Sequence, residues 1–536
     1  MAESAGKYDY IIVGAGTAGC VLANRLTQDP NISVLLLEAG AKDDYGWVHL
    51  PIGFLRTNDN PRTDWQYRTE PNPGLNGRSL LYPSGKVLGG SSSIGGMVYQ
   101  RGQAQDYDRW ADLTGDASWR WDQVLPLFKK SEDYAGGANE FHGAGGDWRV
   151  EKQTSGWDIL DAFRDAVAQK GIPKTDDFNR GTSAEACGYF DVNQKNALRW
   201  NTAKAFLKTI MRRGNLDIMT GSQVTRLIIQ QTEQGNVCTA VEFVGGGREW
   251  IADVSRETIL AAGTFGSPQI LQRSGIGPSA LLRQHGIAVI QDLPGVGENL
   301  QDHLQLKMVF KISGAKSLNT LTKGWIGKAS LGLQYLMKKK GPLATIPAPL
   351  GAMVRSDSSQ SSPDLFFQIQ PWSQDSVGTP THDFPAFTVS VANLKATSRG
   401  SVRITSSDAT IPPVITNNYL STPEDQEKAK AAIELTRKIV AAQALQPYAL
   451  QEIQVDDDLL RLAGTIAFAG TNPVGTCKMG RGDDAAAVVD SEFRVRGIAG
   501  LRVADASVMP IIPAGDTSAS TIMLAEKAAI LIRTSR

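Results

Sequence analysis

The sequence contains few cysteines and few histidines, and neither type forms a cluster. The four cysteines, at positions 20, 187, 238 and 477, lie far apart and form no C-x-x-C pair. This spacing argues against a disulfide scaffold and against a zinc site. We therefore expect no metal, a reducing compartment and a cytoplasmic location. The five histidines lie at positions 49, 142, 285, 303 and 382.

Long apolar runs and an excess of charge are also absent. No stretch reaches the ~18 apolar residues that a membrane helix needs, and "YIIVGAG" is too short for a signal peptide. Lys plus Arg equals Asp plus Glu at 55 each, so no basic excess attracts nucleic acid or an anionic membrane. We expect neither an integral membrane segment nor a nucleic-acid partner.

Glycine, by contrast, is abundant. The chain has 54 glycines in 536 residues, above the usual ~7%. Such an excess, without a collagen period or low complexity, indicates many positions where the backbone must approach something closely.

The segment from Tyr8 to Gly40 has the pattern of a dinucleotide-binding βαβ unit. "YIIV" predicts a buried strand, "AGCVLANRLT" a helix and "SVLLLE" a second strand. Between the first two, Gly14, Gly16 and Gly19 form G-x-G-x-x-G, which allows a tight turn and a pyrophosphate on the helix N-terminus. Glu38 ends the second strand, where an acidic residue accepts hydrogen bonds from a ribose diol. The unit predicts dinucleotide binding without separating NAD from FAD.

Further motifs give the chain its resemblance to a known family. Two glycine- and serine-rich loops, "GKVLGGSSSIGGMVYQRG" (85–102) and "GTFGSPQILQRSGIG" (263–277), run into apolar segments. Four further motifs follow in order: "NLQDH" (299–303), "SRGSV" (398–402), "GTCKMG" (475–480) and "GLRVADASVMPIIPAGDT" (500–517). With these motifs the chain resembles the glucose–methanol–choline (GMC) oxidoreductases over nearly its whole length, most closely the choline-dehydrogenase branch.

The resemblance implies an α/β fold in two parts. A Rossmann-like FAD-binding domain is expected over residues 1–160, 215–310 and 465–536. A substrate-binding domain, built on an antiparallel sheet flanked by helices, is expected over 161–214 and 311–464. In the latter, Pro- and Ser-rich turns separate strand candidates such as "DLFFQIQ" and "AFTVSVANL", and helices are expected near 327–340 and 424–444.

The strand "DLFFQIQ" is expected to roof the substrate pocket. Its polar Gln368 and Gln370 alternate with Phe367 and Ile369, so one face would pack on a core and the other would face a cavity or solvent. With Phe366, these two glutamines are the residues expected at the substrate.

The resemblance also implies that the chain binds FAD as a non-covalent cofactor. It further implies which residues contact it. The glycine turn would hold the pyrophosphate, Glu38 the adenosine ribose and Val224 the adenine. Ile94 stands where some relatives carry a histidine bonded to the flavin. The other residues expected to contact FAD are Thr17, Ala18, Ala39, Leu88, Gly90, Gly96, Met97, Val98, Ala262, Asp505 and Thr517.

The expected catalytic pair departs from the family pattern. Most relatives have a histidine base at the position of Asn472 and Asn or His at that of Asp516. An asparagine amide takes no proton near neutrality, whereas a carboxylate in an apolar pocket has its pKa raised towards useful values. We therefore expect Asp516 to accept the proton and Asn472 to orient the alcohol oxygen.

Other interpretations of these positions remain open. Asp516 precedes a helical run and could simply cap that helix, and Asn472 could mark a lost activity. Gly95 stands where relatives usually carry an asparagine. Trp65 and Tyr67 in "DWQY" could stack on a flavin or fill the core.

The function expected is FAD-dependent oxidation of a small or medium alcohol to an aldehyde or ketone, with O₂, a quinone or another acceptor reoxidising the flavin. One alternative is a flavin photoenzyme like the fatty acid photodecarboxylases, although Ala348 and Gln368 stand where those enzymes need Cys and Arg. Another is a flavin-binding relative without redox turnover.

Overall fold

The N-terminal strand organises one half of the molecule. β1 (Glu3–Val13) runs parallel to β2 (Val34–Glu38) and to β15 (Arg248–Leu260), and α1 (Thr17–Leu26) connects the first two. All of β2 is buried, which explains its continuous apolar sequence. The computed structural model describes residues 2–153, 156–321, 332, 333, 335, 337, 339, 341–376 and 378–534.

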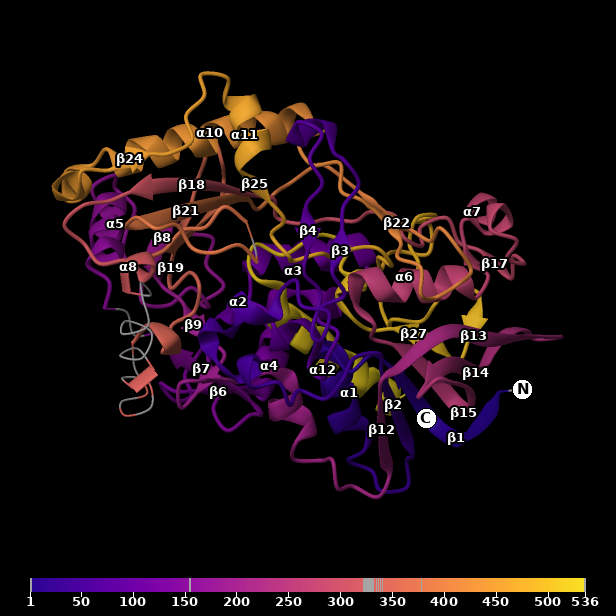
Figure 1. Ribbon diagram of the computed structural model, residues 1–536. Helices are drawn as coiled ribbons and strands as arrows, with labels where there is room; N and C mark the ends of the chain where they lie inside the picture. Colours follow the sequence, from indigo (N-terminus) through magenta and orange to yellow (C-terminus); the bar gives the residue numbers. More distant parts are fainter. Residues whose placement is uncertain are drawn as a thin grey trace.

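This first sheet joins segments from both ends and the middle of the chain. Its strands follow the order β12-β2-β1-β15-β14-β13, with β26 beside β14 and β27 beside β15. α12 packs on α1 and α6 packs on β13, so helices cover the sheet (Figure 1). The elements not yet bounded are β12 (Leu216–Thr220), β13 (Ser222–Thr232), β14 (Gly235–Gly245), β26 (Ile498–Ala499), β27 (Leu501–Val503), α6 (Gly263–Arg273) and α12 (Thr517–Thr534).

A second, antiparallel sheet forms the other half. Its order is β24-β18-β21-β20-β19-β8, with β25 beside β18. One face packs on α10 and α5, and Figure 1 shows α10 and α11 lying along this sheet. The elements are β8 (Ala186–Tyr189), β18 (Gln305–Lys311), β19 (Leu350–Val354), β20 (Leu365–Gln370), β21 (Ala386–Asn393), β24 (Gln451–Glu452), β25 (Ala467–Phe468), α5 (Asp158–Ala168), α10 (Pro423–Val440) and α11 (Leu459–Ile466).

The predicted α/β fold class, a Rossmann-like half and an antiparallel half, is confirmed. The boundary expected at residue 310 falls inside β18, and β25 joins the second sheet although it follows the boundary expected at 464. α10 occupies most of the segment expected to be helical near 424–444. The helix expected near 327–340 falls largely on residues outside the described part of the chain.

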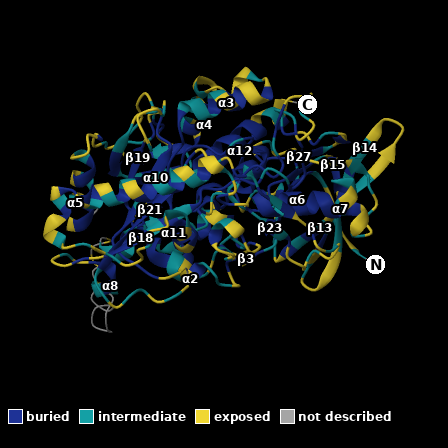
Figure 2. Ribbon diagram, turned by 90° about the horizontal axis from the view of Figure 1, so that it is seen from above, coloured by how far each residue is buried: buried dark blue, intermediate teal, exposed yellow. Residues whose placement is uncertain are grey.

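The two longest described helices, α12 in the first half and α10 in the second, differ in how much of their surface is buried. α12 is buried along most of its length, whereas α10 buries one stripe and exposes the other, as Figure 2 shows. Within the described residues, no helix combines the length and the hydropathy that crossing a bilayer requires.

Candidate functional site

A cavity of about 530 Å³ lies against the C-terminal ends of β1 and β2. Gly14 turns the chain out of β1 with φ +101°, a conformation that favours glycine. A Cβ at Gly19 would overlap the carbonyl oxygen of Gly14, so this glycine lets α1 pack closely on the turn. Gly16, Thr17 and Ala18 line the cavity.

The N-terminus of α1 is open towards this cavity. No side chain caps the helix, and its first turn has no acidic residue. The free N–H groups and the helix dipole therefore favour an anion such as a pyrophosphate.

Glu38 lies in the same cavity wall as the turn. Its Oε2 accepts a hydrogen bond from the backbone N–H of Ala15 at 2.8 Å, and Oε1 accepts from Gly40 at 2.7 Å. Burial raises the pKa of Glu38 to about 7, against the opposing effect of these two bonds. Ala39 also lines the cavity.

The far wall near Val224 is closed by a loop that the sequence did not point to. Residues 409–413 line the cavity beside Val224 and Arg273. Gln223 holds the loop by donating from Nε2 to the carbonyl of Ala409 at 2.7 Å. The sequence of this loop, "ATIPP", is typical of an ordinary turn.

Two polar side chains, Asp505 and Asn193, also line the cavity. Asp505 accepts from the backbone N–H of Gly263 at 2.9 Å and from the Ser267 hydroxyl at 2.6 Å. Asn193 is buried, and its Nδ2 has no hydrogen-bond partner among the described residues. A ligand in the cavity would satisfy this donor. The residues that line this part from the serine-rich loop are Gly90, Ser91, Ser92, Gly95, Gly96 and Met97, and Ala262 and Thr517 also line the cavity.

Asn472 and Asp516 line this same cavity. Asn472 Oδ1 accepts a weak hydrogen bond from the Thr517 hydroxyl at 3.4 Å, and its amide donates no hydrogen bond to a described residue. Asp516 Oδ1 accepts from the backbone N–H of Ser518 at 2.9 Å, as a helix cap does. The Ser518 side chain adds a second hydrogen bond to the carboxylate. Burial raises the pKa of Asp516, and the Ser518 bond opposes that rise.

Asp302, from the "NLQDH" motif, fixes the segment that carries Asn472. Its Oδ1 accepts from the backbone N–H of Asn472 at 2.8 Å, and Oδ2 accepts from Gly470 at 3.0 Å. Tyr419 donates to the same Oδ2 at 2.7 Å. The motif alone indicates no role for Asp302, because the contact joins positions 170 residues apart.

Several residues expected at the cofactor or substrate are not among the residues that line this cavity. Gly19, Leu88 and Val98 do not line it. Phe366, Gln368 and Gln370 lie on β20, outside the cavity lining. Ile94 is also buried outside it.

Trp65 and Tyr67 stack on each other in the wall of the cavity. Their rings stack at 5.8 Å with an interplanar angle of 6°, and both line the cavity. Tyr67 also packs edge-on against Phe265 at 5.2 Å.

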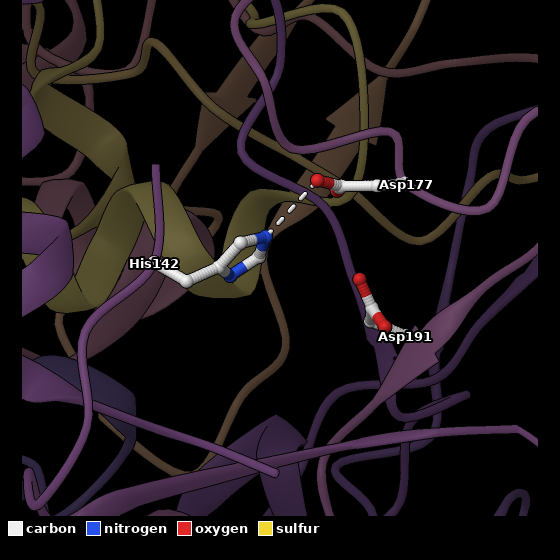
Figure 3. A group of neighbouring side chains, drawn as sticks. All are labelled: His142, Asp177 and Asp191. Atoms are coloured by element: carbon white, nitrogen blue, oxygen red, sulfur yellow. Dashed lines mark hydrogen bonds and ion pairs between the residues drawn. The ribbon is translucent and has the colours of Figure 1, made fainter. Parts of the chain in front are cut away.

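His142, Asp177 and Asp191 form a second polar cluster, and Figure 3 shows the His142 ring directed towards Asp177 with Asp191 nearby. His142 Nε2 lies 3.2 Å from Asp177, and Lys152 lies 3.0 Å from Asp191. Burial opposes a charge on His142, but its contacts with Asp177 and with Glu132 outweigh it and raise the pKa of His142. The protein's own cations therefore already pair with these carboxylates.

The chain is similar in sequence and in structure to known oxidoreductases. Two family models described as GMC oxidoreductase match residues 8–305 and 396–525. The oxygen-dependent choline dehydrogenase of Photobacterium profundum is 40% identical, over 97% of this chain and 92% of that protein. The alcohol dehydrogenase (acceptor) of Pseudomonas putida is 37% identical, over 98% of this chain and 95% of that protein. The structure of pyridoxine 4-oxidase from Mesorbium loti is 30% identical, with a TM-score of 0.88 over 98% of both chains.

Proposed function

Because this chain belongs to the GMC oxidoreductase family, we propose that it uses FAD to oxidise the CH–OH group of a small or medium alcohol to an aldehyde or ketone. One observation carries the proposal. The glycine turn and Glu38 line the same cavity as Asn472 and Asp516, so a single extended ligand could reach both ends.

The residues present fit a non-covalently held FAD. The open N-terminus of α1 suits a pyrophosphate, and Glu38 retains acceptor capacity for a ribose diol. The unpartnered amide of Asn193 offers a donor to a polar ring. Among the described residues that line the cavity there is neither a histidine nor a cysteine to bond the flavin, which supports a non-covalent link.

Residues of the chain would accept the hydroxyl proton of the alcohol and orient its oxygen. FAD, when bound, supplies the hydride acceptor. Asp516 takes the hydroxyl proton on Oδ2, the oxygen to which the backbone N–H of Ser518 does not donate. Asn472 donates its amide N–H to the alcohol oxygen and thereby orients the carbon, while Asp302 keeps Asn472 in place. A positioned base of this kind is worth about 10²–10⁴ in rate.

The electron acceptor is proposed only as O₂ or a quinone-type compound. Relatives named for oxygen and for an unspecified acceptor are similarly close in sequence. The four buried, unpaired cysteines support a reducing compartment such as the cytoplasm.

The function is tested by mixing the yellow holoenzyme anaerobically with a panel of alcohols and recording flavin bleaching. The proposal expects at least one alcohol to bleach the flavin and to yield the matching aldehyde or ketone. Bound FAD that no alcohol reduces at any pH above the pKa of Asp516 would contradict it and favour a flavin protein without turnover. FAD released by denaturation would confirm the non-covalent link.

A further inference from the structure

Three strands of the second sheet present a row of polar side chains on one face. Lys307 on β18 pairs with Ser390 on β21, and Ser390 pairs with Gln368 on β20. Directly opposed residues project to the same face with Cβ atoms ~4.5–5.5 Å apart. Their neighbours Leu306 and Phe367 project to the other face and belong to the apolar core beneath α10. We call Lys307, Ser390 and Gln368 the polar row.

The polar row shares its sheet face with Phe366, which packs near the catalytic end of the cavity. Phe366 lies two residues before Gln368, so it shares the face of the row. It packs in one apolar cluster with Met97 and Ala514. Met97 lines the cavity, and Ala514 lies two residues before Asp516.

The other end of the row approaches the same place. Phe468 pairs with Gln305 on the edge of β18, and its ring centroid lies 4.1 Å from Lys307 Nζ. The chain then continues directly to Thr471 and Asn472 in the cavity wall.

Each member of the polar row has donor capacity that the described residues leave unused. Lys307 is half-buried and makes no hydrogen bond or ion pair within the described chain; only the Phe468 ring contacts its ammonium. Ser390 is 1% exposed, and its Oγ has no partner among the described residues. Gln368 Oε1 accepts from Gln305 Nε2 at 2.7 Å, which leaves the Gln368 amide N–H groups unbonded in the same region.

We propose that the alcohol carries a carboxylate group, which Lys307, Ser390 and Gln368 bind while its CH–OH group lies at Asn472 and Asp516. The inference rests on the function proposed above and narrows its substrate class to hydroxycarboxylic acids. A carboxylate accepts hydrogen bonds on two oxygens, and bonds from a charged donor are about twice as strong as neutral ones.

The electrostatics of Lys307 support an anionic ligand. Burial lowers the pKa of Lys307 to about 8, because no carboxylate lies close enough to compensate for its lost hydration. The amine is still charged near neutral pH, so a bound anion would supply the missing partner. The same charge would repel a quaternary ammonium, the group carried by choline, for which several relatives are named.

Direct binding tests the proposal without turnover. Holoenzyme is titrated with saturated carboxylates from propionate to decanoate and with alkyltrimethylammonium salts of the same lengths, and the flavin absorbance gives the Kd. We expect at least one carboxylate to bind and the ammonium salts not to. Lys307→Met should weaken carboxylate binding by about 10- to 100-fold, the range for a hydrogen-bonded charge, whereas Lys307→Arg should stay near wild type.

Lys311→Met is the matched control. Lys311 lies on the same strand but is exposed, so its loss should leave carboxylate binding unchanged. If no carboxylate perturbs the flavin, or if Lys307→Met binds carboxylates as well as wild type, the proposal is overturned.

Turnover separates this proposal from the function on which it rests. The wild type should oxidise a hydroxycarboxylate with a higher kcat/KM than the diol of equal length, and choline should not be oxidised. Lys307→Met should raise KM for the hydroxycarboxylate and leave the diol unaffected. Equal kcat/KM for the hydroxycarboxylate and the diol would overturn the proposed carboxylate site and leave the proposed alcohol oxidation standing. Carboxylate binding without oxidation of any alcohol overturns the oxidase or dehydrogenase function alone.

Discussion

Oδ1 of Asp302 accepts a hydrogen bond from the backbone N–H of Asn472 at 2.8 Å. The other oxygen accepts from Gly470, so one carboxylate holds both sides of Thr471. Thr471 has φ +60°, an unusual conformation for a β-branched residue that the surroundings must enforce. The position of the Asn472 side chain therefore depends on a residue from a different segment of the chain.

Asp302→Asn tests this dependence. An amide has one acceptor oxygen in place of two, so one of the two backbone N–H groups loses its partner, at about 1–3 kcal/mol of unfolding free energy. We expect slower anaerobic flavin reduction with FAD still bound, and a lower midpoint in urea. Asp357→Asn, at an exposed loop carboxylate, is the control. Wild-type reduction rates in Asp302→Asn would show that Asn472 needs no such support.

Substitutions at Gly16 and Gly19 should have different effects, the first on FAD binding and the second on the stability of the fold. A Cβ at Gly16 would meet only the Cα of Gly90 at 3.8 Å, whereas one at Gly19 would overlap a backbone oxygen. Gly16→Ala should therefore leave urea stability within about 0.5 kcal/mol but weaken FAD binding at least tenfold. Gly19→Ala should destabilise the fold by about 2 kcal/mol or more. Urea unfolding measures the stability, and titration of the apoprotein with FAD measures the affinity. Equal stability and equal FAD affinity of the two variants would contradict these different roles.

The pH dependence of flavin reduction should report Asp516. The base must be ionised to accept a proton, and burial raises its pKa above 3.8. The rate constant should therefore be low at acid pH, rise as pH passes the raised pKa and level off above it. Stopped-flow reduction from pH 4 to 8 measures this profile. A rate that is flat across the acid range would assign the proton to another group.

Glu38 should make the stability of the apoprotein pH-dependent. Its folded pKa of about 7 exceeds the unfolded value of 4.5, so the folded state binds the proton more tightly. The stabilisation is present below pH 4.5 and is lost as pH rises through 7, by at most a few kcal/mol. Urea unfolding at pH 5 and pH 7.5 should show this loss in wild type and not in Glu38→Gln. The same pH dependence in both proteins would indicate another group.

The sequence predicted the parts of the site that are local in the chain. The turn at Gly14 and the acidic end of β2 follow from one βαβ pattern, and Asp505 follows from the family motifs. Leu88 and Val98 belong to the same serine-rich loop as residues in the cavity wall, but they are buried in apolar clusters and do not line the cavity. Sequence spacing does not determine which way a loop residue points.

The parts that could not be predicted depend on contacts between distant segments. The pairing of Lys307 with Ser390 and of Ser390 with Gln368 depends on the register of three strands. A shift of one residue in any strand would move these side chains to the core face. Asn193 likewise follows a short strand that gives no sequence signal for a ligand.

Flavin reduction by Asp516→Asn shows directly whether Asp516 is the catalytic base. The variant is mixed anaerobically with the best alcohol from the panel, and its reduction rate is compared with wild type and with Asp516→Glu. We predict a loss of about 10²–10⁴ in rate for Asp516→Asn with FAD still bound, and partial activity for Asp516→Glu. A wild-type rate in Asp516→Asn would show that the carboxylate serves only as the cap of α12.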